Sequence, residues 1–212
     1  MSISENIQKM KSEIPEGVTL VAVSKTKPIS DIEKAYNSGQ LIFGENKVQE
    51  LVEKHNKLPK NIQWHMIGHL QTNKVKFIAP FVSLIHGVDS EKLLIEIDKR
   101  AKQNNRIIDC LLQVHITRES AKFGFSSEEI KDIIPKLESY KNVNIIGLMG
   151  MATFTKNEIQ IKEEFSFLSD IYKKHKQMNT LSMGMSGDYK IAIDCGSTMI
   201  RIGSTIFGNR NY

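Results

Sequence analysis

Eight short apolar runs, each followed by a segment with helical periodicity, constrain the fold of this chain more than any other feature of its sequence. The runs cover residues 19–24, 41–43, 63–67, 83–88, 109–116, 144–149, 180–183 and 199–202. Several, such as TLVAV and IIGLM, are nearly continuous in apolar residues, as in strands buried on both faces of a parallel sheet. Eight strands alternating with helices predict a single α/β domain, a (β/α)8 barrel of the TIM type.

Helical periodicity fills the segments between these runs. Ser30 with Glu33 and Ser126 with Glu129 have the spacing of capping boxes, so each pair predicts the start of a helix. Pro135 lies inside the second of these helical patterns and predicts that the helix kinks or ends early.

Length and composition favour one soluble domain over residues 1–212. The chain is 40% hydrophobic and 25% charged, and its net charge of +5 attracts small anions weakly without requiring nucleic acid. The polar start MSISENIQKMKSE lacks the apolar core of a secretory signal, and no apolar run has the length of a membrane span. Cys110 and Cys195 are too few for a disulfide framework. We therefore expect a cytoplasmic protein with neither nucleic acid nor a membrane as its partner.

Two lysines follow the first apolar run, at the end of the strand where barrels of this type carry their active sites. Lys25 directly follows VAVS, and Lys27 lies two residues further on. Partial burial of a lysine favours the neutral amine, which is the form that attacks an aldehyde. A lysine that reaches solvent from a strand end has the same pattern. Strand spacing therefore leaves open whether a lysine is reactive here, and which of the two it is.

Small residues follow the last two apolar runs and predict a phosphate site. Ser186 and Gly187 lie in MSGD after the seventh run, and Gly203 and Ser204 begin the GST that follows the eighth. Backbone N–H groups, hydroxyls and helix N-termini bind phosphate, and the loops after strands seven and eight are its usual position in these barrels. Turns have the same composition, but two such clusters at the expected strand ends favour the phosphate.

Arg201 interrupts the apolar run MIRIG, and a buried arginine needs a partner. One candidate is an acid such as Asp194, and the other is a ring nitrogen of a bound cofactor. His65 and His69 are four residues apart without a third ligand in the pattern, so we expect no metal site.

The assembled motifs resemble the pyridoxal phosphate homeostasis protein family, also known as YggS or PROSC. The matching stretches, between residues 21 and 208, are VAVSKTKP, FGENKVQE, WHMIGHLQTNK, LLQVHI with ESAKFG, GLMGMA, LSMGMSGD and GSTMIRIGSTIFG. The resemblance implies a barrel like the N-terminal domain of bacterial alanine racemase and pyridoxal 5′-phosphate (PLP) as the cofactor.

The resemblance also implies roles for particular residues. It places PLP on Lys25, as a Schiff base, rather than on Lys27. It assigns the phosphate contacts to Ser186, Gly203 and Ser204, the pyridine nitrogen to Arg201, and a position beside the cofactor to Asn46. Lys47 stands where the family often has a tyrosine, which leaves the contribution of that side chain open.

A positive arginine at the ring nitrogen disfavours its protonation and weakens carbanion chemistry on the cofactor. Together with the resemblance, this favours a protein that holds PLP for vitamin B6 homeostasis, with PLP-dependent apo-enzymes as recipients, no catalytic residue of its own, and a monomeric state. The alternative is a PLP-dependent amino-acid racemase, although the sequence leaves no room for the second domain of alanine racemase. Lys122 is a further aldehyde acceptor to consider, and a plain surface lysine is the simpler interpretation.

Overall fold

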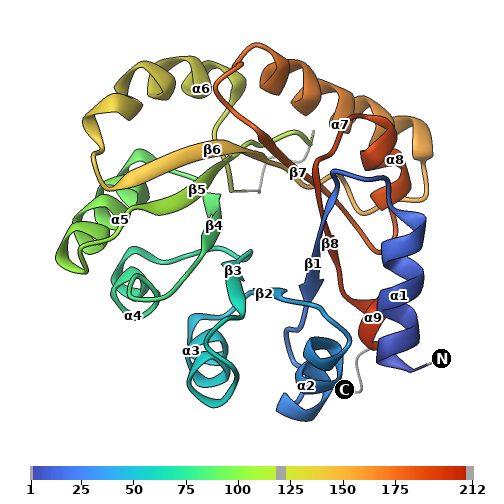
Figure 1. Ribbon diagram of the computed structural model, residues 1–212. Helices are drawn as coiled ribbons and strands as arrows, with labels where there is room; N and C mark the ends of the chain where they lie inside the picture. The colour runs from blue at the N-terminus through green and yellow to red at the C-terminus, as the bar shows by residue number, and fades with distance from the viewer. Residues whose placement is uncertain (1, 118–122, 209–212) are drawn as a thin grey trace.

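Eight parallel strands form a closed barrel in the computed structural model, which describes residues 2–117 and 123–208 (Figure 1). The strands follow one another around the barrel in chain order, and pairing of the first with the last closes it. They are β1 (Thr19–Val23), β2 (Ile42–Glu45), β3 (Gln63–Met66), β4 (Leu84–Val88), β5 (Ile108–Gln113), β6 (Val143–Met149), β7 (Thr180–Met185) and β8 (Met199–Ile202). The predicted fold class is confirmed.

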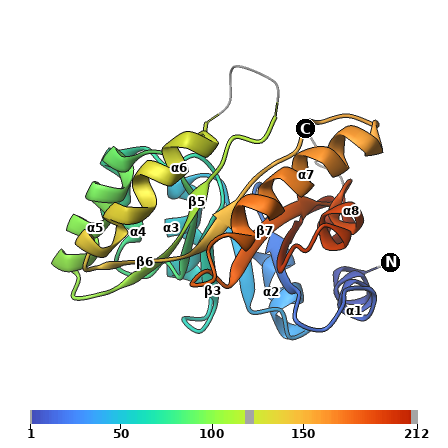
Figure 2. The ribbon, with the colours of Figure 1, turned by 90° about the horizontal axis from the view of Figure 1, so that it is seen from above.

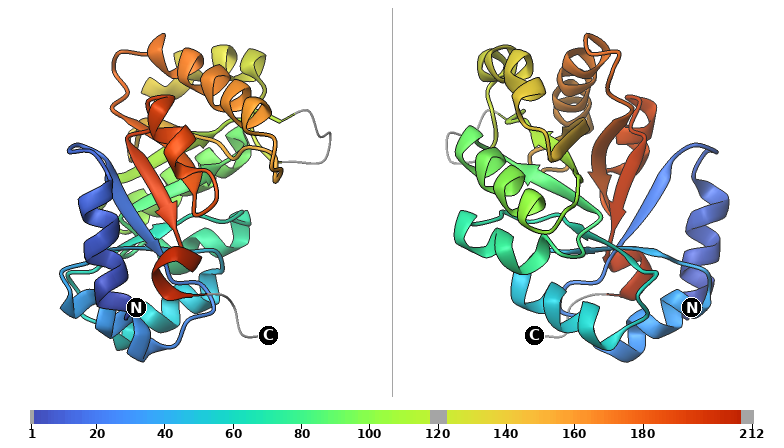
Figure 3. Two further views of the ribbon diagram at one scale, coloured as in Figure 1. Left: turned by 90° about the vertical axis from the view of Figure 1, so that its right-hand side faces the viewer. Right: turned by 60° about the vertical axis from the view of Figure 1, so that its left-hand side comes forward.

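Helices surround the strands (Figures 1 and 2). They are α1 (Ile3–Glu13), α2 (Ile29–Asn37), α3 (Val48–Lys57), α4 (Val75–Ile78), α5 (Glu91–Gln103), α6 (Ser127–Ile133), α7 (Glu158–Lys173), α8 (Tyr189–Asp194) and α9 (Ser204–Phe207), with 3-10 turns at Thr72–Lys74 and Ile134–Ser139. The first helix packs against α2 and α9, which places the start of the chain beside its last helix (Figure 3). Within the described residues, no helix is long and apolar enough to cross a membrane.

The local signals of the sequence agree with this fold except at one helix start. Ser126 and Glu129 form the predicted capping box of α6, and the helix gives way to a 3-10 turn that contains Pro135. The box predicted at Ser30 is wrong, because α2 already begins at Ile29 after the N-cap Pro28. A proline at the entry to a helix loses no hydrogen bond, since the first N–H groups have no partner within the helix.

The interior of the barrel is layered. Its lower layer is apolar and consists of Val21, Leu84, Leu111, Met149 and Met199, from five different strands. The strand residues that alternate with this layer face outward and pack under the helices, as Ala22 and Phe43 do. Alternation along β1 and β2 therefore decides which side chains point into the barrel.

A polar layer lies above the apolar one. His86 Nε2 lies 3.0 Å from His65 Nδ1, and His86 Nδ1 lies 3.1 Å from Ser182 Oγ. Arg201 donates to the same Ser182 oxygen. Arginine can only donate, so Ser182 Oγ accepts from Arg201, and the tautomers of His86 and His65 set the donors of the two remaining bonds. Burial holds both imidazoles neutral, with the pKa of His65 lowered to about 3 and that of His86 well below its usual value.

Close backbone contact between β6 and β7 requires a glycine. A Cβ atom on Gly147 would lie 1.7 Å from the carbonyl oxygen of Thr180. These two residues are paired across the strands, beside a register irregularity between β5 and β6. The bare backbone at Gly147 therefore allows this part of the barrel wall to close.

We predict that Gly147→Ala lowers the free energy of unfolding by at least about 3 kcal/mol, the upper end of overpacking costs. Gly187→Ala is the control, because nothing lies within 4 Å of its added methyl group. It should change stability by no more than about 0.5 kcal/mol. Urea unfolding followed by circular dichroism measures both, and equal stability of the two variants would contradict the close contact.

Acid should destabilise the apo-protein through the buried histidines. Their folded-state pKa values lie below the unfolded value, so the unfolded state binds more protons below about pH 6.5. Their stabilising contribution is full above that pH and is lost as the pH falls from there towards 3, the pKa of folded His65. His65 alone should account for about 2 kcal/mol between pH 7.5 and pH 5.

Urea unfolding at both pH values tests this expectation. A variant with both His65→Gln and His86→Gln should be less stable at neutral pH but should lose less stability on acidification. An equal loss in the variant and the wild type would show that other groups cause the effect.

Candidate functional site

Closure of the barrel brings distant parts of the chain together at one part of its C-terminal edge. Strands β7, β8, β1 and β2 are consecutive neighbours in the barrel wall. The predicted site residues lie on these strands or within two residues of their ends: Lys25, Asn46, Ser186, Arg201, Gly203 and Ser204. Residues from the two ends of the sequence thus share one edge.

Lys25 lies in a tight turn between β1 and α2. The backbone N–H of Lys27 donates to the Ser24 carbonyl at 3.0 Å and closes the turn around Lys25 and Thr26. Thr26 has a φ of 65°, the sign that the third position of a type II turn requires and that β-branched residues rarely adopt. Lys25 is partly buried and follows β1, whose residue Val21 lies in the apolar layer of the barrel interior.

Lys27 forms hydrogen bonds with the C-terminal end of α9. Its Nζ donates to the carbonyl oxygens of Phe207 at 2.9 Å and Gly208 at 3.2 Å. A cation at the C-terminal end of a helix is favoured by the helix dipole and satisfies carbonyls that have no partner within the helix. Lys27 therefore has a structural role at α9.

Arg201 is buried in β8 at 3% exposure. Its Nη1 donates to the carbonyl and hydroxyl oxygens of Ser182, at 3.0 and 2.5 Å, and its Nη2 donates to the Gly150 carbonyl at 3.1 Å. The proposed pairing with Asp194 is wrong, because that carboxylate is exposed. Burial lowers the pKa of Arg201 to about 10, and the charge of Asp188 opposes this shift.

The guanidinium of Arg201 is thus held by neutral groups. Among the described residues, no carboxylate lies within ion-pair distance of it. Two of its five N–H donors, Nε and the second hydrogen of Nη2, are not used by these bonds. These two donors leave the guanidinium able to bind a further acceptor.

The loops after β7 and β8 are joined by a hydrogen bond. The backbone N–H of Gly203 donates to Ser186 Oγ at 3.2 Å. Ser204 is the first residue of α9, and the first N–H groups of a helix have no acceptor within it. Asp188 accepts from the Met185 N–H at 2.6 Å, and burial raises the pKa of its carboxyl.

Close contact with a neighbouring loop fixes the backbone of Asn46. A Cβ atom on Gly68 would lie 2.6 Å from the Asn46 carbonyl oxygen, and one on Gly87 would lie 2.9 Å from the Gly68 carbonyl oxygen. The loops after β2 and β3 and the strand β4 therefore touch through their backbones. Because Gly68 and Gly87 have no side chains, these backbones can approach closely, and the contact holds Asn46 at the rim of the barrel.

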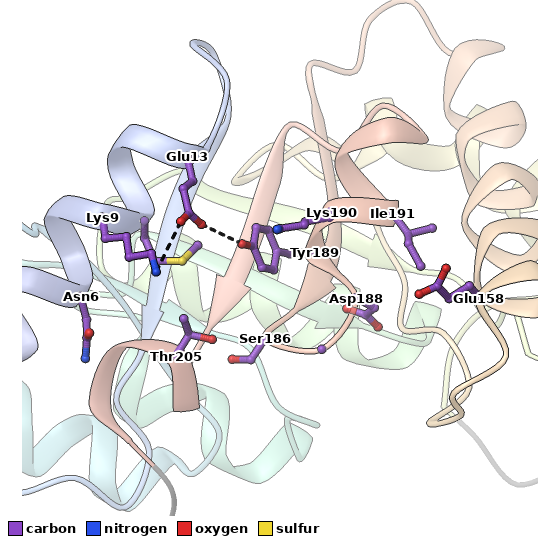
Figure 4. A pocket seen from close by; sticks show the side chains of 12 residues that line it. Asn6, Lys9, Glu13, Glu158, Ser186, Asp188, Tyr189, Lys190, Ile191 and Thr205 are labelled. Carbon is purple, nitrogen blue, oxygen red and sulfur yellow. Dashed lines mark hydrogen bonds and ion pairs between the residues drawn. The ribbon is translucent and has the colours of Figure 1, made fainter. Parts of the chain in front are cut away.

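A cavity of about 520 Å³ lies beside this edge, between α1, α8 and α9 (Figure 4). Ser186 is the one predicted site residue among those lining it. Glu13, Glu158 and Asp188 outnumber the lysines in its wall, Lys9 and Lys190. Such a lining does not favour a phosphate, so we place the candidate site at the strand ends rather than in this cavity.

Other sequence candidates lie apart from these strand ends. His65 bonds to His86 within the barrel, whereas His69 Nδ1 lies 2.8 Å from Asp89 Oδ2, so the two predicted neighbours do not share a ligand. In the part of the chain that the structure describes, no group of three or more metal-ligating side chains is present. Lys122 lies outside the described residues.

Sequence reasoning missed the partners of Arg201. His86 and Ser182 are fully buried polar residues within otherwise apolar strands. A histidine in LIHGV, on the same face of the strand as Leu84, is a signal that could have pointed to a polar interior. The role of Gly150 could not be found, because it acts through its carbonyl oxygen.

Comparison with known proteins finds similar sequences along nearly the whole chain. The model of the alanine racemase N-terminal domain matches residues 1–211. A pyridoxal phosphate homeostasis protein of Aquifex aeolicus is 37% identical, with 99% of this chain and 96% of the relative covered. A protein of the same name from Haemophilus influenzae is 39% identical over 92% of this chain and 86% of the relative.

Solved structures agree with these matches. PipY of Synechococcus elongatus with PLP bound is 33% identical, with a TM-score of 0.89 over 98% of this chain and 100% of that chain. Alanine racemase from E. faecalis, at 18% identity and a TM-score of 0.79, shares the fold over 98% of this chain and 58% of the enzyme. On its near-complete match to curated relatives at more than a third identity, and with its racemase-type barrel, this chain belongs to the pyridoxal phosphate homeostasis protein family.

Proposed function

We propose that this protein binds PLP through a Schiff base on Lys25 and holds it for intracellular vitamin B6 homeostasis, without catalysing a reaction of its own. The observation that carries the proposal is the set of residues at the ends of β7, β8, β1 and β2. The turn that contains Lys25, the bonded loops after β7 and β8, and the buried guanidinium of Arg201 lie at these strand ends. These are the groups that a phosphorylated pyridine aldehyde needs.

Arg201 supports the fit of the cofactor. Its buried guanidinium has unused donors and no carboxylate partner among the described residues. A neutral pyridine nitrogen is an acceptor that satisfies such a donor without burying a second charge. Ser182 and Gly150 fix the plane of the guanidinium, so its orientation does not depend on the ligand.

Lys25 and Lys27, which follow β1, have different roles in this proposal. PLP supplies an aldehyde, and a neutral amine attacks it. Lys27 donates to the carbonyl oxygens at the end of α9, and the resemblance of VAVSKTKP to the family supports Lys25 as the attached lysine. Ser186, Gly203 and Ser204 bind the phosphate in this proposal, with the N-terminus of α9 directed at it, and Asn46 borders the cofactor.

The names of the relatives support storage rather than turnover. The curated relatives are named homeostasis proteins, and the PipY structure contains PLP. The alanine racemases share only the fold at their low identity, and this barrel corresponds to 58% of the E. faecalis enzyme. We propose PLP-dependent apo-enzymes in the cytoplasm as recipients, and a monomer as the holding form.

We predict that wild-type protein gains a visible absorption band with PLP and that Lys25→Ala does not. Borohydride reduction should fix the cofactor to the peptide that contains Lys25, as peptide mass mapping will show. Lys27→Ala is the matched control and should keep the band, because its side chain is committed to α9. A band that persists in Lys25→Ala would move the attachment to another lysine.

The same samples distinguish storage from racemase activity. Holo-protein incubated with L-alanine in heavy water should leave the Cα hydrogen in place, as NMR will measure. Exchange of that hydrogen in the wild type, and its loss in Lys25→Ala, would favour the racemase instead.

We predict that Ser204→Ala weakens binding of PLP by about tenfold or more, the effect of one hydrogen bond to a charged group. Ser204 is exposed at the start of α9, so its substitution disturbs no core contact. Binding of pyridoxal, which lacks the phosphate, should be unchanged. Ser204→Thr keeps the hydroxyl and serves as the control, and an equal loss for pyridoxal and PLP would argue against a phosphate contact.

A further inference from the structure

A buried ion cluster lies between α3 and the barrel wall. Lys54, on the inner face of α3, donates from Nζ to the Ser24 carbonyl at 2.8 Å, Glu45 Oε1 at 2.8 Å and Glu50 Oε1 at 2.7 Å. These contacts use all three donors of the ammonium. The side chains of Lys54 and Glu45 are 5% and 0% exposed. Lys54 thus joins a helix to two strand ends, and one of these leads into Lys25.

Glu45 completes the cluster at the end of β2. Its Oε1 also accepts from Ser24 Oγ at 2.5 Å, whereas its buried Oε2 has no partner. Burial raises the pKa of the Glu45 carboxyl, and the charge of Lys54 opposes the shift. Buried ion pairs seldom stabilise a fold more than apolar side chains of the same size do. A gain in stability therefore does not by itself explain why charged side chains are buried between α3 and the barrel wall.

The cluster holds the backbone on both sides of Lys25. Before it, the Ser24 carbonyl accepts from Lys54. After it, the N–H of Thr26 donates to Glu50 Oε1 at 2.5 Å. Thr26 has the positive φ that is unfavourable for a β-branched residue. A strained conformation persists where the surroundings determine it strongly, and here Glu50 supplies that restraint.

We propose that Lys54, with Glu45 and Glu50, is a positioning residue for Lys25: the cluster fixes the turn so that the Lys25 amine is presented at the barrel edge in one direction. The inference rests on the proposed function of Lys25. Lys54 acts through the backbone and does not contact the cofactor in this proposal. The cluster reaches Lys25 from the outer side of the barrel wall, opposite to the side on which the cofactor is proposed to bind.

The same helix offers a matched control. Lys57 pairs with Glu53 at 2.7 Å with the same spacing of four residues, but their side chains are 57% and 61% exposed. Lys57→Met removes an equal charge from α3 without touching the turn. Lys54→Met leaves Glu45 buried and unpaired and so carries a risk of misfolding. Glu50→Ala, at a side chain only partly buried, tests the same restraint more safely.

The experiment compares the binding of PLP with that of pyridoxine 5′-phosphate, which has the phosphate and ring but no aldehyde. Lys54→Met and Glu50→Ala should weaken PLP binding by at least about tenfold, while binding of pyridoxine 5′-phosphate stays within about threefold of the wild type. Glu50→Gln keeps an oxygen acceptor for Thr26 and should restore most of the PLP affinity. Lys57→Met should bind both ligands as the wild type does.

A second readout needs no cofactor. Reductive methylation of the apo-protein by formaldehyde, mapped by peptide mass, reports the reactivity of Lys25 and should change in Glu50→Ala but not in Lys57→Met. Circular dichroism and thermal melting establish that each variant is folded.

The outcomes separate this inference from the proposed function. Folded Glu50→Ala with wild-type affinity for PLP and wild-type methylation of Lys25 would overturn the positioning role. An equal loss of both ligands would also overturn it, because that result indicates general damage to the site. A wild-type protein without a PLP band, or a band that survives Lys25→Ala, would instead overturn the function on which the inference rests.

Discussion

The pairing of the first strand with the last is the interaction on which the rest of this structure depends. Thr19, Leu20, Val21 and Ala22 pair with the four residues of β8, so the barrel closes only when the two ends of the chain meet. The turn that contains Lys25 and the residues Gly203 and Ser204 after β8 become neighbours through that one set of hydrogen bonds. Contacts between residues so distant in sequence carry a large cost in loop-closure entropy. The candidate site therefore exists only in the completed barrel.

The barrel interior combines an apolar floor with a polar layer that is satisfied internally. Arg201, Ser182, His86 and His65 form one connected chain of hydrogen bonds. The low dielectric of the interior strengthens such bonds and makes any unpaired member costly. The chain thereby fixes the orientation of the arginine before any ligand arrives. In the proposed function, a cation oriented in this way at the ring nitrogen would suit the holding of the cofactor better than its use as an electron sink.

Much of this architecture could be predicted from the sequence, because continuous apolar runs and capping residues are local signals. The strands predicted to begin at residues 19, 63 and 199 do begin there, and the capping box at Ser126 is present. The box at Ser30 was wrong, since Pro28 is the N-cap and α2 begins at Ile29. Ser182, Gly150 and Lys54 escaped prediction because their roles arise from contacts across strands and helices, which no spacing along the chain reports. The position of the six site residues at one edge followed from the fold class, while their individual roles remain predictions.

The turn after β1 and the helix after β8 are joined directly, since Lys27 donates to the carbonyl oxygens at the end of α9, a helix of four residues whose first residue is Ser204. In the proposed function, the contact with the aldehyde and a contact with the phosphate lie on these two segments. A ligand would then need an aldehyde and a phosphate at a separation that matches both contacts. A phosphorylated aldehyde of another length would reach only one of them.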